Sequence, residues 1–217
     1  MFKYQTLRTD LRGDAATPEI ERLSEDRSQV SKSVRDLLVF LDSRSTEPVL
    51  EVGICHAGTA CVRIANLAPE RVFVAVDPFG DMPYQGRGGD GLVHMYTDAL
   101  ARASLSNLFT AGFRANVNVQ HWKQLSTDFL RRSIEPGFFR LGKPEPFRFG
   151  NVFLDGSHVS EVVAEEIRLV RPLLSATGTI VIDNLDYQQT DGSALADGVA
   201  QAAEELGLSG EGISDVL

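Results

Sequence analysis

The chain of 217 residues is long enough for one domain with a well-developed core, with or without a small appendage. Hydrophobic residues make up 43% of it, which is ordinary for a globular protein. No apolar run is long enough to cross a membrane, and the N-terminus lacks the apolar core of a signal peptide. We therefore expect a cytoplasmic protein with no membrane partner. The 30 acidic residues outnumber the 21 basic ones, and a net charge of -9 argues against a nucleic-acid partner, because nucleic-acid binding depends on neutralising phosphates.

Residues 1–17 look irregular, and helical signals follow from about Thr17 to Asp42. Thr17 and Pro18 suit the start of a helix, and apolar residues recur at helical spacing as far as Leu41. The polar stretch SEDRSQV interrupts this spacing, so the pattern is compatible with one helix or two. We predict an N-terminal helical extension over residues 1–47, whose amphipathic helix could serve a contact in a homo-oligomer.

From residue 48 onward, apolar strand segments alternate with helical ones. We expect strands at 48–53, 71–77, 116–122, 151–155 and 178–183, helices at 59–68, 95–109, 125–134, 160–171 and 193–208, and irregular loops at 78–94 and 135–150. Nearly all-apolar strands that alternate with helices are typical of a parallel sheet covered on both faces. We therefore predict a doubly wound α/β domain over residues 48–217, with a mainly parallel sheet that binds ligands at the carboxyl ends of its strands.

The first two strands end in a glycine loop and an acid. The loop LEVGICHAGTA contains Gly53 and Gly58, which let a backbone turn tightly beside a ligand, although an ordinary strand-to-helix turn also uses such glycines. Asp77 follows Gly53 by 24 residues, an offset at which an acid can accept hydrogen bonds from the hydroxyls of a ribose, or can cap a loop. Together these features favour a nucleoside-bearing ligand. The glycine spacing does not match G-x-G-x-x-G, which disfavours a nicotinamide-dependent dehydrogenase.

Polar or aromatic side chains also end the other three strands. Trp122 ends the third strand and could lie against a purine or pack in the core. Asp155 ends the fourth strand and Asp183 with Asn184 ends the fifth, so neighbouring parallel strands would bring these side chains together. Two carboxylates and an amide oxygen suit Mg²⁺ or Mn²⁺, whereas two unrelated carboxylates that cap loops are the alternative. We expect the two cysteines to be free thiols, so a metal site would use oxygen and nitrogen ligands.

Taken in order, these elements resemble the class I S-adenosylmethionine-dependent methyltransferases. The E-x-G-x-x-x-x-G-T loop, the stretch VDPFGDMP and the later LDGSH…RPLLSATGTIVIDN are similar to motifs of the macrocin O-methyltransferase type, from about Pro48 to Asn184. The spacing also resembles that of the catechol O-methyltransferases, which place their magnesium ligands Asp and Asp-Asn 28 and 29 residues apart. Asp155, Asp183 and Asn184 have these spacings, and His158 stands three residues after the first ligand, where that family has its general base.

The resemblance implies a Rossmann-like fold that binds S-adenosylmethionine, and it implies a role for each motif residue. The cofactor-binding residues would be Glu51, Gly53, Gly58 and Thr59 around the methionine part, Asp77 at the ribose, His121 and Trp122 beside the adenine, and Asp155. The ligands of Mg²⁺ or Mn²⁺ would be Asp155, Asp183 and Asn184. His158 would be the catalytic base, although a solvent-exposed loop histidine is the plain alternative.

Three features depart from the family pattern. Ala57 replaces a usual glycine, and the stretch DNLDY permits another register that uses Asp186 and Tyr187. The chain also ends about ten residues after the last predicted helix, where the family fold normally continues with two more strands. Either these C-terminal strands are missing or the sheet closes differently.

We therefore expect an enzyme, an S-adenosylmethionine- and divalent-cation-dependent O-methyltransferase. Its partner would be a small hydroxylated acceptor, a sugar or another secondary metabolite, and the loops at 78–94 and 135–150 would shape the acceptor pocket. A cation-dependent hydroxylase-like protein of related fold and a non-catalytic nucleoside-binding module are the alternatives.

Overall fold

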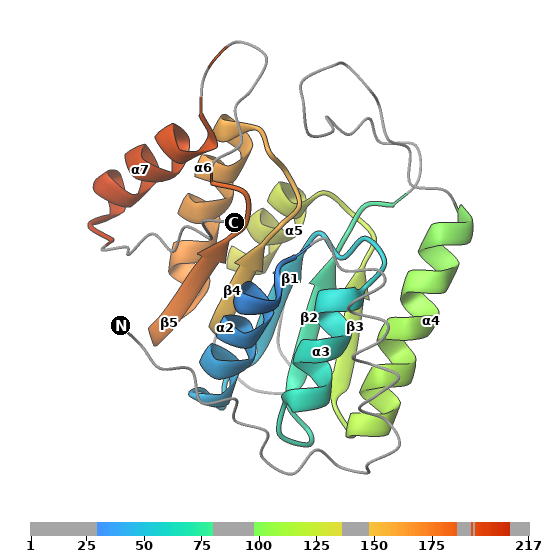
Figure 1. Cartoon of the computed structure of the whole chain (residues 1–217). Coiled ribbons are helices and arrows are strands. Elements are labelled where there is room, and N and C mark those ends of the chain that lie inside the picture. Colours follow the sequence, from blue (N-terminus) through green and yellow to red (C-terminus); the bar gives the residue numbers. More distant parts are fainter. Residues whose placement is uncertain (1–29, 80–97, 136–147, 186–191, 193, 209–217) are drawn as a thin grey trace.

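The computed structural model describes residues 30–79, 98–135, 148–185, 192 and 194–208 (Figure 1). Strands β1 to β5 span Val49–Val52, Val72–Val76, Asn118–Trp122, Phe149–Leu154 and Leu174–Ile182. Helices α2 to α7 span Lys32–Ser43, Gly58–Asn66, Asp98–Ala115, Ser126–Ile134, Ser160–Val170 and Leu195–Leu206, and a short 3-10 helix spans Arg171–Leu173. The predicted loops at 78–94 and 135–150, and the first part of the predicted N-terminal helix, lie largely outside the described residues.

The five strands form one parallel sheet in the order β3-β2-β1-β4-β5. Strands β1, β2 and β4 are buried along their whole length, which explains their nearly continuous apolar sequences. The strand order reverses between β1 and β4. In a sheet of this kind, a ligand binds beside the carboxyl ends of the strands at that reversal.

Helices cover both faces of the sheet, as Figure 1 shows. On one face, α3 and α4 pack against buried side chains of β1 and β2, and α2 lies beside α3 and β4. On the other face, α5, α6 and α7 enclose a second apolar cluster with the opposite sides of the same strands. The predicted doubly wound, Rossmann-like α/β fold is confirmed.

Strands β4 and β5 begin earlier than their apolar runs suggest. β4 begins at Phe149, inside the stretch predicted to be irregular, and its second residue is Gly150. A Cβ added to Gly150 would lie 2.1 Å from the Ser45 hydroxyl, so a close approach of two segments explains this glycine. β5 begins at the buried Leu174, and the next four residues are small or polar and at least partly exposed. An edge strand tolerates such residues because one of its sides faces water.

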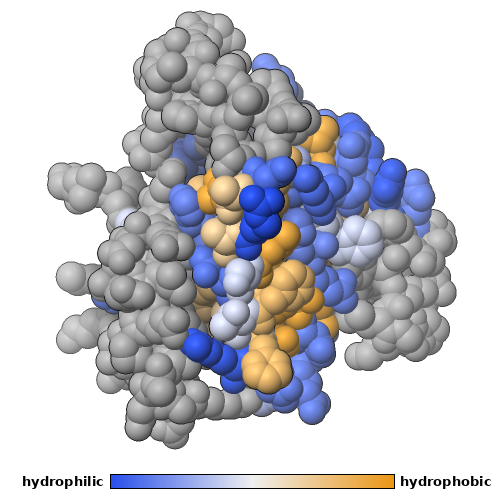
Figure 2. Space-filling model, turned by 90° about the vertical axis from the view of Figure 1, so that its right-hand side faces the viewer, coloured by the Kyte–Doolittle hydropathy of each residue, from blue (hydrophilic) through white to orange (hydrophobic). Residues whose placement is uncertain are grey.

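Helix α4 continues to Ala115, past the end predicted at Phe109. The helix stops where Asn116 takes up a left-handed conformation with φ of 53°, which asparagine tolerates better than most residues. Figure 2, viewed from the side on which α4 lies, shows apolar side chains on the described surface. Phe109 and Phe113 of α4 are 47% and 89% exposed, so neither marks the buried side of the helix. No helix in the described part of the chain has the length and apolar character needed to span a bilayer.

Candidate active site

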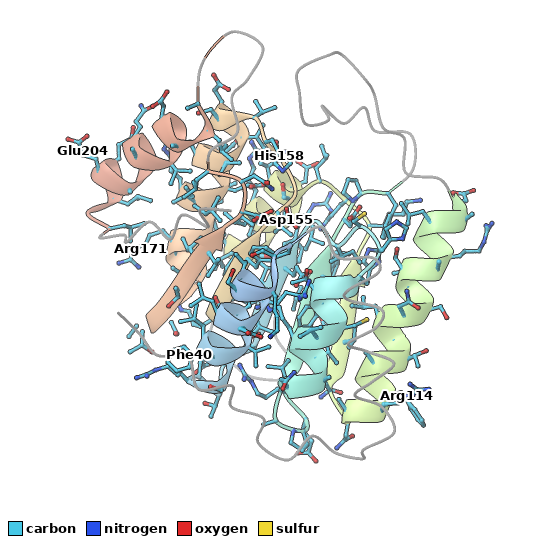
Figure 3. The ribbon with its side chains drawn as sticks, in the orientation of Figure 1. Phe40, Arg114, Asp155, His158, Arg171 and Glu204 are labelled. Atoms are coloured by element: carbon cyan, nitrogen blue, oxygen red, sulfur yellow. The ribbon has the colours of Figure 1, made fainter. Side chains whose placement is uncertain are left out.

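A cavity of about 470 Å³ opens at the carboxyl ends of β1, β2 and β4. Four residues predicted for the site line it, namely Gly53, Asp77, Asp155 and His158. Figure 3 shows Asp155 and His158 at the same end of the sheet. The cavity therefore lies where the strand order predicts a ligand.

Gly53 lets the ends of β1 and β4 approach each other. Its φ is +79°, and its N–H donates to the carbonyl of Val76 at 2.9 Å. A Cβ added here would lie 2.3 Å from the backbone oxygen of Asp155 and 2.6 Å from Cα of Gly156. Both the backbone angle and the contact exclude a side chain at this position.

Asp77 holds the loop after β1 through its carboxylate. Oδ2 accepts hydrogen bonds from the backbone N–H groups of Ile54 (2.9 Å) and Cys55 (3.2 Å), and Oδ1 accepts one from Phe79 (2.9 Å). Burial raises the pKa of Asp77, and these three donors act in the opposite direction. A carboxylate offers about four acceptor positions, so the backbone contacts leave about one for a ligand hydroxyl.

Glu51 lies on the other side of β1 from the cavity. Its side chain is 1% exposed, and Oε2 pairs with Arg63 Nη1 at 3.1 Å. The Arg63 guanidinium also donates to both carboxylate oxygens of Asp42, at 2.9 and 3.1 Å. Burial raises the pKa of Glu51 to about 7 against the opposing effect of Arg63. Gly58 and Thr59, which begin α3, are also buried and do not line the cavity.

His121 and Trp122 lie behind the cavity wall. The His121 ring is 5.5 Å from the ring of Phe79, which does line the cavity, and burial lowers the pKa of His121. The Trp122 ring is 5.7 Å from that of Phe129 and packs against the apolar cluster under α5. Trp122 thus packs against the core, and neither side chain is among those that line the cavity.

The three predicted metal ligands follow adjacent strand ends. Leu154 pairs with Ile182 in the β4–β5 register, and the Asp183 N–H donates to the Leu154 carbonyl at 3.1 Å, so Asp155 and Asp183 leave the sheet side by side. Asn184 has a φ of 56° and its Nδ2 donates to Oδ2 of Asp183.

His158 belongs to the same group. It is only 7% exposed, so it is not a solvent-exposed loop histidine, and its Nε2 lies 3.3 Å from Nδ2 of Asn184. The local fold therefore brings His158, Asn184 and Asp183 together beside Asp155, which lines the cavity.

The chemistry of this group fits a hard cation. Within the described ranges, no set of three or more His, Cys, Asp or Glu side chains is arranged as a metal site. The predicted set contains two carboxylates, and its third member is the amide of Asn184. A half-turn of that amide exchanges Nδ2 for Oδ1, which would complete the oxygen set that Mg²⁺ prefers. The other register, through Asp186 and Tyr187, lies outside the described residues.

One wall of the cavity was not predicted from the sequence. The first turn of α5 and the side of α6 contribute Leu125, Ser126, Thr127 and Glu165. These residues could have been found from the place of α5 in the chain. The helix begins just after β3, at the edge of the sheet where ligands bind.

Comparisons with known proteins agree with this fold. The structure is similar to that of the O-methyltransferase TomG from Streptomyces achromogenes, involved in tomaymycin synthesis and solved in complex with SAM, with a TM-score of 0.58 and 20% identity over 91% of this chain and 79% of that one. It is similar to the O-methyltransferase from Bacillus cereus in complex with SAH, with a TM-score of 0.58 and 14% identity over 92% and 81% of the two chains. For the SAH-bound Podospora anserina methyltransferase PaMTH1 the TM-score is 0.54, with 16% identity over 88% and 80%.

Sequence comparison identifies the family. A search of curated protein sequences gives no match. A family model described as a methyltransferase domain matches residues 50–185, which is more than half of the chain. This span begins in β1 and runs past Asn184, so it includes the cavity and the ends of β4 and β5. The chain therefore belongs to the methyltransferase-domain family and is a methyltransferase.

Proposed function

We propose that this protein is an S-adenosylmethionine- and divalent-cation-dependent O-methyltransferase that acts on a hydroxyl of a small molecule. One observation carries the proposal: Asp155 and His158 line the same cavity as Gly53 and Asp77. A cofactor held at the ends of β1 and β2 would thus have its reactive end beside a carboxylate and a base. TomG and the Bacillus cereus enzyme, which share the fold, were solved with SAM and SAH.

The cofactor would lie along the carboxyl ends of β1, β2 and β3. Gly53 leaves room for close backbone approach, and Asp77 has about one acceptor position for a ribose hydroxyl. His121 would support the adenine side from behind Phe79, and Trp122 would do so from the apolar cluster under α5. Glu51, Gly58 and Thr59 would act indirectly, because none of them lines the cavity. The pair between Glu51 and Arg63 joins β1 to α3, and Gly58 and Thr59 form the buried start of that helix.

Asp155, Asp183 and Asn184 would hold Mg²⁺ or Mn²⁺. Such a cation lowers the pKa of an oxygen that binds to it, which makes an acceptor hydroxyl easier to deprotonate. His158, whose Nε2 lies 3.3 Å from Nδ2 of Asn184, would take the proton of that hydroxyl on a ring nitrogen. The acceptor oxygen would then form a bond to the methyl carbon as the carbon–sulfur bond breaks, and S-adenosylhomocysteine would leave.

The acceptor would be a sugar or another secondary metabolite, in line with the resemblance of the motifs to the macrocin O-methyltransferase type. TomG, with the same fold, takes part in tomaymycin synthesis. The N-terminal helical extension, which includes α2, would provide a contact for a homo-oligomer.

The test compares wild type, Asp155→Ala and Asp128→Ala with SAM, Mg²⁺ and a panel of hydroxylated acceptors. Asp128 is a control, because its half-exposed carboxylate lies on α5 and outside the cavity lining. We expect Asp155→Ala to lose at least about 100-fold in turnover and Asp128→Ala to keep the wild-type rate. Equal turnover by wild type and Asp155→Ala would contradict the metal role.

Calorimetry with SAH, with and without Mg²⁺, separates the enzyme from a binding module. Binding without turnover of any acceptor would favour the non-catalytic module. Absence of SAH binding would contradict the cofactor assignment itself.

A further inference from the structure

Two neighbouring glutamates of α6 have very different surroundings. Glu165 lines the cavity and forms an ion pair with Arg131 of α5. Glu166 is fully buried, accepts a hydrogen bond on Oε1 from the Ser126 hydroxyl, and has no hydrogen-bond partner for Oε2 among the described residues. A buried carboxyl oxygen without a partner costs stability. Packing alone therefore does not explain a glutamate at position 166.

Ser126 connects Glu166 with the cavity. It is the first residue of α5 and lines the cavity together with Leu125 and Thr127. A serine hydroxyl has one proton to donate and two lone pairs that accept. Because Ser126 donates its proton to Glu166, its oxygen can only accept a hydrogen bond from a group in the cavity.

We propose that Glu166 is a positioning residue that takes up the Ser126 proton in a hydrogen bond, so that the Ser126 oxygen can only accept one from the ligand. Ser126 then favours a purine that carries an amino group over one that carries a carbonyl. This inference rests on the proposed S-adenosylmethionine site. Ser126 follows four residues after Trp122 at the end of β3, where that proposal puts the adenine. The exocyclic amino group is the hydrogen-bond donor of the adenine ring, whereas hypoxanthine has a carbonyl at the same carbon.

The electrostatics of the pair set the conditions for a test. Burial raises the pKa of Glu166 to about 7, the hydrogen bond from Ser126 lowers it, and the charge of Glu165 raises it further. At pH 8.5, above this pKa, the ionised form of Glu166 predominates, and it has no proton to donate to Ser126. The direction of the hydrogen bond is then fixed.

The experiment measures dissociation constants for S-adenosylhomocysteine and S-inosylhomocysteine by calorimetry at pH 8.5. We expect wild type to bind the adenosyl compound about 10- to 100-fold more tightly, the value of one hydrogen bond near a charged group. In Glu166→Gln the neutral amide can donate to Ser126 as well as accept, so the preference falls below about threefold. Ser126→Ala loses the preference by removing the acceptor. Glu161→Gln, a change in an exposed glutamate of α6 that lies outside the cavity lining, keeps it.

A double-mutant comparison distinguishes positioning through Ser126 from a general structural role. If Glu166 acts through Ser126, Glu166→Gln leaves the ratio of the two constants unchanged in the Ser126→Ala background. A wild type that binds both nucleosides equally, or a Glu166→Gln variant that keeps the wild-type ratio, would overturn the inference and leave the proposed function intact. A wild type that binds neither compound would overturn the proposed function and this inference with it.

Discussion

Gly53 and Asp155, 102 positions apart in the sequence, are in backbone contact at the edge of the cavity: a Cβ on Gly53 would lie 2.3 Å from the Asp155 carbonyl oxygen. The contact joins the loop after β1, which would face the cofactor, to the strand end that would hold the metal. The distance between the cofactor part and the metal part of the proposed site thus depends on the absence of a side chain at Gly53.

Gly53→Ala should therefore damage both stability and binding. The substitution adds left-handed strain at φ +79° and a clash with a backbone atom that has little room to move. We expect a loss of at least about 2 kcal/mol in the free energy of unfolding, measured by urea titration, and loss of SAH binding.

Gly207→Ala is the matched control for this substitution. Gly207 has a φ of +61°, but a Cβ added there would meet nothing within 4 Å. It should cost only about 1 kcal/mol, the strain of the left-handed conformation alone. Equal losses in the two variants would show that the contact with Asp155 is unimportant.

His158→Gln should reduce turnover without weakening cofactor binding. The side chain is buried at the cavity wall beside Asn184, and glutamine preserves a polar group but cannot act as the base. We expect kcat to fall about 10²- to 10⁴-fold while the dissociation constant of SAH changes less than about twofold. Asp128→Ala, with a half-exposed carboxylate outside the cavity lining, should keep the wild-type rate. A parallel loss of SAH binding in His158→Gln would argue for a structural histidine instead.

The sheet and the residues that follow its strands could be predicted from the sequence. Alternating apolar strands and helices predict the sheet, and the spacing between Asp155 and Asp183 corresponds to neighbours in the observed register. His158 was proposed as the base because it stands three residues after Asp155, as in the resembled family, and that role stays a prediction.

The orientation of side chains within a strand was harder to predict. Side chains alternate along a strand, so Glu51 shares a face with Val49 and points toward α3, whereas Val52 points to the cavity. Nothing local in the sequence indicates that Arg63, 12 residues later, lies opposite Glu51. The roles of Ser126 and Glu166 depend likewise on the packing of α5 against α6, which no spacing within either helix encodes.

Arg63→Met should destabilise the whole domain. Its guanidinium is fully buried and satisfies Asp42, Glu51 and the Leu50 carbonyl, so its removal leaves at least one buried carboxylate without a counter-charge. We expect a loss of about 3–5 kcal/mol in the free energy of unfolding. Arg168→Met, which breaks the exposed pair with Glu205, is the control and should scarcely move the urea midpoint. Similar midpoints for both variants would contradict the importance of the buried network.

The stability of the protein should depend on pH through Glu166, the residue proposed to position Ser126. Burial raises the pKa of Glu166 from 4.5 to about 7, so the folded state holds this proton more tightly than the unfolded chain does. The resulting stability is fully present below pH 4.5 and is lost as the pH rises to about 7, by up to about 3 kcal/mol. Glu51, also raised to about 7, adds a loss of the same sign.

Glu166→Gln removes only its own share of this loss. Urea titrations at pH 5 and pH 8 should therefore show a smaller fall in the free energy of unfolding for the variant than for wild type. Identical falls in the two proteins would show that Glu166 does not take up a proton on folding. We expect the variant to be the more stable protein at pH 8 and to lose its preference for the adenosyl compound. The carboxylate would then cost stability at the pH where it orients Ser126, as expected of a residue retained for binding.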